Sequence, residues 1–306
     1  KRVVLAGGSG FIGRSLSACL AAKGYEVVVL SRQPARLPKG VVGVVGVAWD
    51  GRTPGEWTAC VDGACAVVNL AGKNVNCRYT TKNLREIDES RVESVAAVNQ
   101  AIAGCKRPPK VLIQASTLAI YGDAGERVCD ETAPLGAGIP VATASAWEAA
   151  FHAHPTPCTK RVLLRISFVL GRDGGALATM ARLARWFLGG TIGSGRQYIS
   201  WIHPIDLNQM FLWAIERDDV EGLYNATSPQ AVTNAEFMRQ LRRAVGRTWS
   251  PPAPAWAVRL GCFLMRTEPV LALTGRRGIP RRFLEQGFPF AHQAVGPGID
   301  DVLAGS

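Results

Sequence analysis

A glycine-rich turn between a strand pattern and a helix pattern, at the start of the chain, constrains the fold most. Residues 3–6 are a short apolar and β-branched run, which is typical of a buried strand. Apolar residues then recur at helical spacing as far as Lys23-Gly24, and residues 25–30 predict a second strand. Strand, turn, helix and strand within about 30 residues predict a βαβ unit.

The turn has the glycine spacing of a dinucleotide-binding loop. Gly8, Gly10 and Gly13 fit GxGxxG, whereas Gly7, Gly10 and Gly13 fit GxxGxxG, and the sequence leaves both alternatives open. Glycines let the chain turn tightly and let a pyrophosphate approach the backbone, while the following helix N-terminus attracts phosphate. The predicted cofactor contacts in this turn are Gly7, Gly10, Phe11, Ile12 and Gly13.

The end of the second strand predicts which cofactor is bound. Ser31-Arg32 stands where a site selecting NAD usually carries Asp or Glu. A guanidinium suits a 2′-phosphate, and a charged hydrogen bond contributes roughly 1.5–3 kcal/mol. We therefore predict NADP(H), contacted by Ser31 and Arg32. The alternative is that Arg32 simply lies in solvent at the strand end.

The alternation of strands and helices continues along the first half. Further strands are predicted at residues 41–49, 66–70, 110–114 and 161–166, and a long helix at residues 81–104. This order predicts an α/β fold, a Rossmann-like doubly wound parallel sheet with helices on both faces. Ligands of such sheets bind beyond the carboxyl ends of the strands. Candidate residues at those ends are the cofactor contacts Asn69, Leu70, Ala71 and Gly72 and the catalytic hydroxyls Ser116 and Thr117.

The pattern changes after residue 172, which predicts a second, smaller unit. We expect residues 1–172 to form the NADP(H)-binding domain, with segments returning from the C-terminal half. We expect residues 173–306 to form a smaller substrate lobe, with helices near residues 205–215 and 234–245.

Composition limits the partners. Lys and Arg number 35 against 24 Asp and Glu, and the net charge of +11 favours anionic partners such as phosphorylated cofactors, unless it is only the mark of an arginine-rich soluble protein. The basic residues are spread out without interleaved aromatic residues, so we expect no nucleic acid. No run of about 18 uncharged apolar residues occurs, so we expect no membrane partner.

The eight cysteines form neither a CxxC nor a zinc spacing. We therefore expect reduced thiols and no metal site. Because residues 1–6 lack an apolar signal region, we also expect a cytoplasmic location.

Over nearly its whole length the chain resembles the extended short-chain dehydrogenase/reductases of the nucleotide-sugar epimerase type. It is most similar to their atypical branch, labelled epimerase family protein, with a small C-terminal domain of unknown function. The resemblance rests on residues 7–13, 69–72, 121–123, 147–148, 169–171, 173–175 and 193–198, on Arg165, and on Trp201-Ile202-His203 followed by Asp206. It implies a Rossmann-like domain, an NADP(H) site, a C-terminal substrate lobe and, by analogy, a homodimer through the helices after the third and fourth strands.

The chain lacks the proton-transfer pair of that superfamily, a Tyr-x-x-x-Lys in which the ammonium lowers the phenol pKa. None of the five tyrosines has Lys four residues further on. If Glu148 matches the family's helix acid, the two positions fall on Pro140 and Ala144, which cannot move a proton. Ser116 or Thr117 remains to orient a carbonyl or hydroxyl group, unless it is only a turn residue.

Tyr121 is the nearest replacement acid or base, although a Tyr-Gly at this place is usually structural in the superfamily. The candidate substrate contacts are Arg165, Arg196, Tyr198 and His203. Each has a structural alternative: an ion pair for Arg165, a surface hairpin for Arg196 and Tyr198, and a helix cap for His203, which with Asp206 could also transfer a proton.

Two functions fit the sequence. The first is an NADP(H)-dependent oxidoreductase or epimerase-like enzyme acting on a small or nucleotide-linked substrate. The alternative is a non-catalytic NADP(H)-binding regulator or sensor, which the missing Tyr-Lys pair favours. The many polar residues at the predicted strand ends favour the enzyme.

Overall fold

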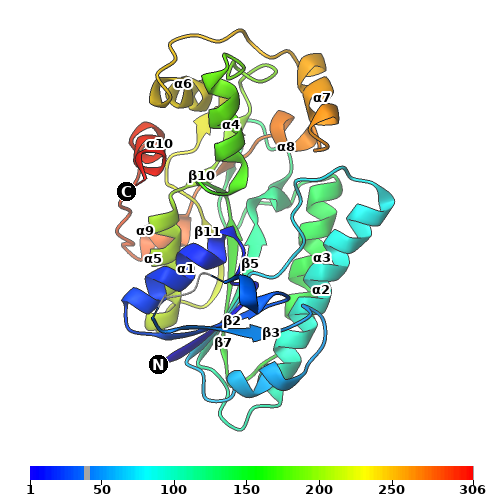
Figure 1. The fold of residues 1–306 in the computed structure, drawn as a ribbon, viewed down its shortest axis with the longest axis vertical. Coiled ribbons are helices and arrows are strands. Elements are labelled where there is room, and N and C mark those ends of the chain that lie inside the picture. Colours follow the sequence, from blue (N-terminus) through cyan, green and yellow to red (C-terminus); the bar gives the residue numbers. More distant parts are fainter. Residues whose placement is uncertain (38–41, 306) are drawn as a thin grey trace.

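A parallel sheet of seven strands lies at the centre of the computed structural model, which describes residues 1–37 and 42–305 (Figure 1). Its strands, in spatial order, are β11 (Gly222–Ala226), β7 (Lys160–Ile166), β5 (Val111–Thr117), β4 (Ala66–Asn69), β1 (Arg2–Ala6), β2 (Glu26–Ser31) and β3 (Val44–Ala48). Every neighbouring pair runs parallel. The predicted Rossmann-like α/β fold is confirmed.

Helices cover both faces of the sheet. Helices α1 (Phe11–Ala22) and α5 (Pro204–Glu216) pack together on one face, and α2 (Thr81–Ala103) and α3 (Ile139–Ala153) pack together on the other (Figure 1). The central strands are therefore buried on both sides, which explains their continuous apolar runs. The edge strand β3 is largely exposed.

The C-terminal half contributes both to this sheet and to a lobe beyond it. Its helices are α4 (Gly175–Arg185), α6 (Asn234–Ala244), α7 (Ala255–Leu264), α8 (Val270–Leu273), α9 (Arg281–Glu285) and α10 (Val295–Ala304). Helices α4, α6 and α10 share a second hydrophobic core, in which Leu177, Phe237 and Ile299 are fully buried. No helix within the described residues is both long enough and apolar enough to cross a membrane.

Short elements complete the chain. Two-stranded pairs join β8 (Phe168–Val169) to β10 (Trp201–Ile202), β9 (Tyr198–Ile199) to β12 (Val232–Thr233), and β6 (Val128–Cys129) to β13 (Arg277–Gly278). Single 3-10 turns are η1 (Pro34–Arg36), η2 (Glu56–Cys60) and η3 (Leu118–Tyr121). They connect the main elements around the sheet.

The structure adds to the central sheet one strand that the sequence pattern did not predict. Strand β11 is short and carries Tyr224 and Asn225, so it lacks the apolar run that marks the other strands. Pairing with β7 makes it a strand and returns a C-terminal segment to the cofactor domain. The predicted start of the third strand, Val41, lies outside the described residues, and β3 begins at Val44.

Candidate functional site

Four predicted ligand-binding segments meet at one edge of the sheet. They follow β1, β2, β4 and β5, which are neighbours in the order β5-β4-β1-β2. Because these strands are parallel, their carboxyl ends all face the same way, and the segments line one end of the sheet. The fold thus brings together the glycine turn, the Ser31-Arg32 pair, residues 69–72 and the Ser116-Thr117 pair.

The glycine turn leaves no room for a side chain at Gly7 or Gly13. Gly7 has a φ of +75°, and a Cβ there would lie 2.8 Å from the backbone of Ala71. A Cβ on Gly13 would lie 2.4 Å from the Cα of Gly8. Of the glycines in this turn, Gly7 is the one in the left-handed region, so the backbone favours the GxxGxxG alternative. The close contact with Ala71 also joins the turn to the loop after β4.

The first turn of α1 presents backbone donors. In an α-helix the first N–H groups have no acceptor within the helix, and here they belong to Phe11, Ile12 and Gly13. No side chain caps the helix at Gly10. The helix end therefore combines free donors with the positive end of the helix dipole, which suits a phosphate group.

The end of β2 carries one exposed cation and one engaged hydroxyl. Arg32 is exposed. Ser31 is buried, and its Oγ lies 3.1 Å from Ser9 Oγ and accepts a hydrogen bond from the Gln33 N–H. Arg14 donates to the Ser9 carbonyl oxygen at 3.1 Å, so a second guanidinium lies at this corner. Sequence reasoning missed Arg14, although an arginine directly after the last glycine of the motif was a visible signal.

Hydrogen bonds of the buried Asn69 side chain hold the loop after β4 in place. Asn69 is fully buried, donates to Gln114 Oε1 at 2.9 Å and accepts from the Ala71 N–H at 3.1 Å. The Leu70 N–H donates to the Ala6 carbonyl oxygen. Asn69 therefore sets the path of the loop, while Leu70 and Ala71 are half-buried at its surface.

A half-buried arginine lies against the same loop. A Cβ on Gly72 would lie 3.3 Å from Arg91 Cζ, and the Arg91 guanidinium stacks over the Trp147 ring at 4.8 Å. Burial lowers the pKa of Arg91. Its Nη1 donates to the carbonyl oxygens of Lys73 and Ile87. Sequence reasoning did not single out Arg91, because only the fold brings α2 beside residues 71–73.

The two candidate hydroxyls at the end of β5 differ. Ser116 is buried and its Oγ donates to Glu148 Oε1 at 2.6 Å. Thr117 is half-buried, and its Oγ1 accepts from the Ala119 N–H at 3.1 Å. Accepting that bond leaves the Thr117 hydroxyl proton free to be donated. Of the two, Thr117 has the geometry of a ligand donor.

A buried ion pair lies directly behind these hydroxyls. Arg165 Nε and Nη2 donate to the two carboxylate oxygens of Glu148, at 2.9 and 2.7 Å. Both side chains are at least 90% buried, with side-chain exposures of 6% and 10%. Burial lowers the pKa of Arg165, but the Glu148 carboxylate outweighs burial, so the net direction is upward. The structure thus gives Arg165 the ion-pair geometry named as its structural alternative.

Tyr121 belongs to the same buried network. Its hydroxyl accepts from Arg165 Nη1 at 2.9 Å and lies 2.8 Å from the Asp130 carbonyl oxygen and 2.9 Å from Asn225 Oδ1, to one of which it donates. The side chain is fully buried. Burial raises the pKa of Tyr121, with Arg165 opposing. A buried phenol with a raised pKa is a poor base at neutral pH, so the geometry favours the structural alternative for Tyr121.

The predicted substrate loop lies in the C-terminal lobe. Arg196 is exposed, whereas Tyr198 is half-buried in β9 with the Arg277 guanidinium 5.5 Å from its ring centroid. The Arg276 N–H donates to the Tyr198 carbonyl oxygen, and burial lowers the pKa of the Arg276 side chain. The Arg277 guanidinium therefore lies against Tyr198, and Arg196 is exposed two residues before it, an arrangement that suits an anionic or polar ligand.

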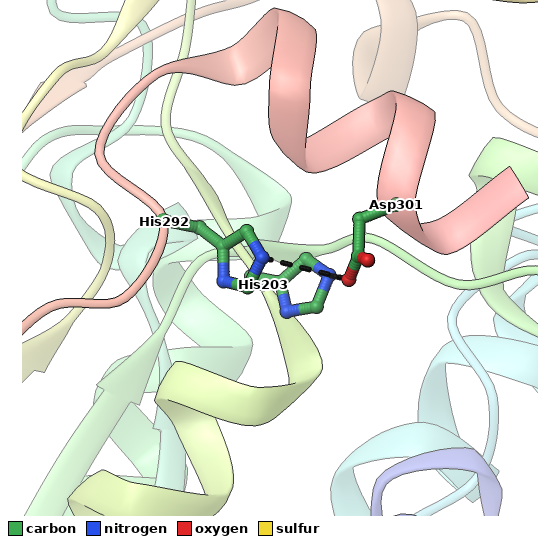
Figure 2. A group of neighbouring side chains, drawn as sticks. All are labelled: His203, His292 and Asp301. Carbon is green, nitrogen blue, oxygen red and sulfur yellow. Dashed lines mark ion pairs between the residues drawn. The ribbon is translucent and has the colours of Figure 1, made fainter. Parts of the chain in front are cut away.

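His203 lies elsewhere, at the start of α5 (Figure 2). Its Nδ1 accepts from the Ile205 N–H at 3.3 Å, so it caps the helix. Its ring stacks on His292, with centroids 3.6 Å apart, and its Nε2 lies 3.1 Å from Asp301 Oδ2. Burial, and to a lesser degree His292, lowers the pKa of His203 to about 4, so the side chain is neutral at physiological pH.

His203, His292 and Asp301 are the residues whose side chains come closest to a metal-binding group within the described part of the chain. An ion bound by both imidazoles must lie near both ring planes. The two rings are stacked only 19° from parallel, so their planes do not meet at a nearby point. The arrangement fits a clamp between α5 and the C-terminal segment better than a metal centre.

Comparison with known proteins places this geometry in context. The model of the NAD dependent epimerase/dehydratase family matches residues 3–226, and a domain of unknown function, DUF1731, matches residues 253–302. The epimerase family protein SDR39U1 of Bos taurus is 34% identical over 308 residues, covering 99% of this chain and all of that protein.

Two solved structures extend the likeness. The human epimerase family protein SDR39U1, crystallised with NADPH, is 32% identical with a TM-score of 0.88, and each chain is wholly covered. A nucleoside-diphosphate sugar epimerase from Corynebacterium glutamicum is 26% identical with a TM-score of 0.78, covering 99% of this chain and 58% of that one.

Proposed function

The chain belongs to the NAD dependent epimerase/dehydratase family, and from this membership we propose that it is an NADP(H)-dependent oxidoreductase or epimerase-like enzyme. Its substrate is a small or nucleotide-linked molecule. The observation that carries the proposal is the uncapped N-terminus of α1 behind a glycine turn that a Cβ would fill. That cradle fits a pyrophosphate because it offers free N–H groups and close backbone approach.

The residues that hold the cofactor follow from the same corner of the sheet. The N–H groups of Phe11, Ile12 and Gly13 would contact the pyrophosphate, and Arg32 and Arg14 would contact a 2′-phosphate. No carboxylate follows β2 to accept from a ribose 2′-hydroxyl. The NADPH in the crystal structure of the human relative supports the same choice.

The chain's own groups would orient the substrate. When bound, a nicotinamide supplies hydride transfer. Thr117 would donate its free proton to a substrate carbonyl or hydroxyl oxygen, and Ser116 and Glu148 would hold the end of β5 in place. Arg196, and Arg277 beside the Tyr198 ring, would attract the anionic part of a nucleotide-linked substrate.

The alternative is a non-catalytic NADP(H)-binding regulator. It is favoured by α3, where Pro140 occupies the first turn and Ala144 is buried against η3. These are the positions that the family resemblance assigns to the missing Tyr and Lys. A regulator would bind the cofactor through the same cradle without turning over any substrate.

The cofactor is tested by titrating the protein with NADPH and then NADH, read by tryptophan quenching. We expect tighter binding of NADPH, and Arg32→Ala should weaken NADPH binding roughly ten- to a hundredfold while leaving NADH unchanged. The matched control is Arg107→Ala, because Arg107 is an exposed arginine that precedes β5, at the end of the sheet opposite to Arg32. Failure to bind either nucleotide would overturn both functions.

Enzyme and regulator are separated by NADPH oxidation in the presence of carbonyl compounds. The enzyme predicts turnover that Thr117→Val reduces, because valine keeps the shape but lacks the hydroxyl. NADPH affinity should be the same in both proteins. Tight NADPH binding with no turnover across the carbonyl compounds would favour the regulator.

A further inference from the structure

Exposed apolar side chains gather at the end of the C-terminal lobe. Trp186, Phe187 and Leu188, directly after α4, are 76%, 47% and 63% exposed. We call these three residues the α4 tip. Single exposed apolar residues are ordinary on a protein surface, but three in sequence at a helix end form a patch.

Helix α7 exposes a second apolar group. Trp256, Leu260, Phe263 and Leu264 are spaced i, i+4, i+7 and i+8, so they share one helix face, and each is more than half exposed. We call them the α7 stripe. Cys262, on the other side of the helix, is buried. The Arg78 guanidinium lies 4.1 Å from the Phe263 ring centroid, at one edge of the stripe. The α7 stripe as a whole nevertheless remains more than half exposed among the described residues.

Backbone hydrogen bonds join the segment that follows the α4 tip to the segment that precedes α7. The Gly193 N–H donates to the Ala253 carbonyl oxygen, and the Ala253 N–H donates to the Thr191 carbonyl oxygen, each at 2.9 Å. This pairing lies a few residues after the α4 tip and just before α7. In Figure 1, α4 begins near the sheet and its other end lies in the upper part of the molecule with α7.

Tryptophan is concentrated at this end. Trp186, Trp249 and Trp256 are 76%, 64% and 69% exposed, whereas the other five tryptophans are buried or half-buried. Tryptophan combines a large apolar ring with an N–H donor. It is therefore enriched where an apolar phase meets water.

The two stretches of chain that carry these residues are rich in arginine. The stretches 174–205 and 237–267, which carry both groups, contain no Asp or Glu. They contain nine arginines, of which Arg182, Arg185, Arg259 and Arg266 are exposed and form no ion pair among the described residues. The apolar residues are thus bordered by cations whose charge no carboxylate of these stretches neutralises.

The backbone at both helix ends is unusual. Phe187 and Arg266 have φ angles of 59° and 57°, and they are the two non-glycine residues with positive φ in the described chain. Bulky residues rarely adopt this conformation, which glycine adopts easily. One ends α4 and the other follows α7, so both departures fall where the exposed apolar groups are.

We propose that the α4 tip and the α7 stripe bind the surface of an anionic phospholipid membrane, with the tryptophans and leucines entering the interface and the arginines contacting lipid phosphates. The combination of Trp, Phe and Leu with surrounding Arg is the pattern of interfacial membrane binding. The chain lies on the membrane and does not span it. The proposal revises the sequence-based expectation that no membrane partner exists.

The positive charge of this surface favours an anionic membrane over a second copy of the chain as the partner. In a symmetric dimer the same patch meets itself, so arginines of one copy would face those of the other. An anionic bilayer instead offers phosphates to the arginines and an apolar interior to the rings. The proposal does not depend on the proposed enzyme activity, because neither group belongs to the cofactor site.

The test is flotation of the full chain with phosphatidylcholine vesicles and with vesicles in which part of that lipid is replaced by phosphatidylserine. We expect binding to the phosphatidylserine vesicles, accompanied by a blue shift of tryptophan emission, and much weaker binding to phosphatidylcholine alone. Trp256→Ala with Leu264→Ala should lower the partition coefficient at least tenfold.

Arg182→Gln with Arg185→Gln should lower it on the order of twentyfold, at about fivefold per charge. The matched controls are Leu284→Ala, another exposed leucine, and Arg85→Gln with Arg107→Gln, which remove the same charge elsewhere. These controls should keep vesicle binding, and every variant should keep NADPH affinity.

Three results would overturn the proposal. One is the absence of binding to either vesicle, and another is equal binding by the patch variants and their controls. The third is concentration-dependent dimerisation in sedimentation that the patch variants abolish, which would assign this face to a second copy.

Discussion

Arg165 and Arg32 both lie at the carboxyl edge of the same sheet, yet the fold gives them opposite surroundings. Arg165 is buried and bonded to both oxygens of Glu148, whereas Arg32 is exposed just beyond β2. Removing the side chain of Arg165 or Glu148 would leave a buried charge unpaired, whereas removing the exposed side chain of Arg32 would leave no buried charge unpaired. The same functional group thus stabilises the fold at one strand end and is available to a ligand at another.

The difference extends to the hydroxyl groups. Tyr121 and Ser116 have their hydrogen bonds satisfied within the buried network, whereas Thr117 keeps a free proton. Two of the predicted catalytic residues, Ser116 and Tyr121, are thus engaged in the buried network, whereas Thr117 is half-buried outside it. Substitutions should therefore separate into those that change stability and those that change affinity.

The largest effect is expected for Glu148→Gln. The neutral side chain leaves the Arg165 guanidinium buried without its counter-charge, which should cost about 3–5 kcal/mol of the free energy of unfolding. Glu89→Gln is the matched control, because Glu89 pairs with Arg85 at 2.6 Å on the surface of α2. Its cost should stay below about 0.5 kcal/mol. Urea unfolding measures the free energy of unfolding of both variants. Equal losses would contradict the expectation that the buried ion pair contributes more to stability than the exposed one.

The next effect is a pH dependence that comes from His203. Its pKa is about 4 in the fold and 6.5 in the unfolded chain, so the unfolded state binds the proton more readily. Its contribution to the free energy of unfolding is fully present above pH 6.5 and is lost as the pH falls towards 4, in total about 3 kcal/mol.

His203→Asn isolates the contribution of His203 titration to the free energy of unfolding, because asparagine also caps a helix but does not titrate. The difference in unfolding free energy between the two proteins should change across that pH window. His154→Asn, an exposed histidine, should leave the wild-type dependence intact. A pH profile shared by all three proteins would show that His203 is not the group responsible.

A smaller effect is expected for Tyr121→Phe. Loss of the hydroxyl removes one acceptor from Arg165 Nη1 and the one donor shared by the Asp130 carbonyl oxygen and Asn225 Oδ1, which should cost about 1–3 kcal/mol of stability. NADPH affinity and any turnover per folded molecule should be unchanged. Loss of turnover with unchanged stability would instead make Tyr121 the replacement acid or base.

The smallest effect on stability is expected for Arg14→Gln. Arg14 is exposed, and among the described residues its side chain donates only to the Ser9 carbonyl oxygen, so the free energy of unfolding should change by less than about 0.5 kcal/mol. NADPH affinity should fall about five- to tenfold, since one charged contact to phosphate is lost. An unchanged NADPH affinity would leave Arg32 as the cation responsible for cofactor choice.

Much of the fold could be predicted because its signals are local. The strand pattern before Gly7, the helix pattern after Gly13 and the absence of a carboxylate after β2 are all read within a few residues. Strand β11 could not be predicted from the sequence, because Tyr224 and Asn225 interrupt its apolar run and only its pairing with β7 makes it a strand.

The βαβ order, the glycine turn and the lack of a Tyr-x-x-x-Lys pair follow from the amino-acid sequence alone, because each depends on residues that are close along the chain. The pairing of polar groups, in contrast, follows from the folded arrangement of distant segments. Tyr121 meets Asn225 across 104 residues, and His203 meets Asp301 from another helix. The role of a polar side chain depends on burial and partners, and distant segments supply both.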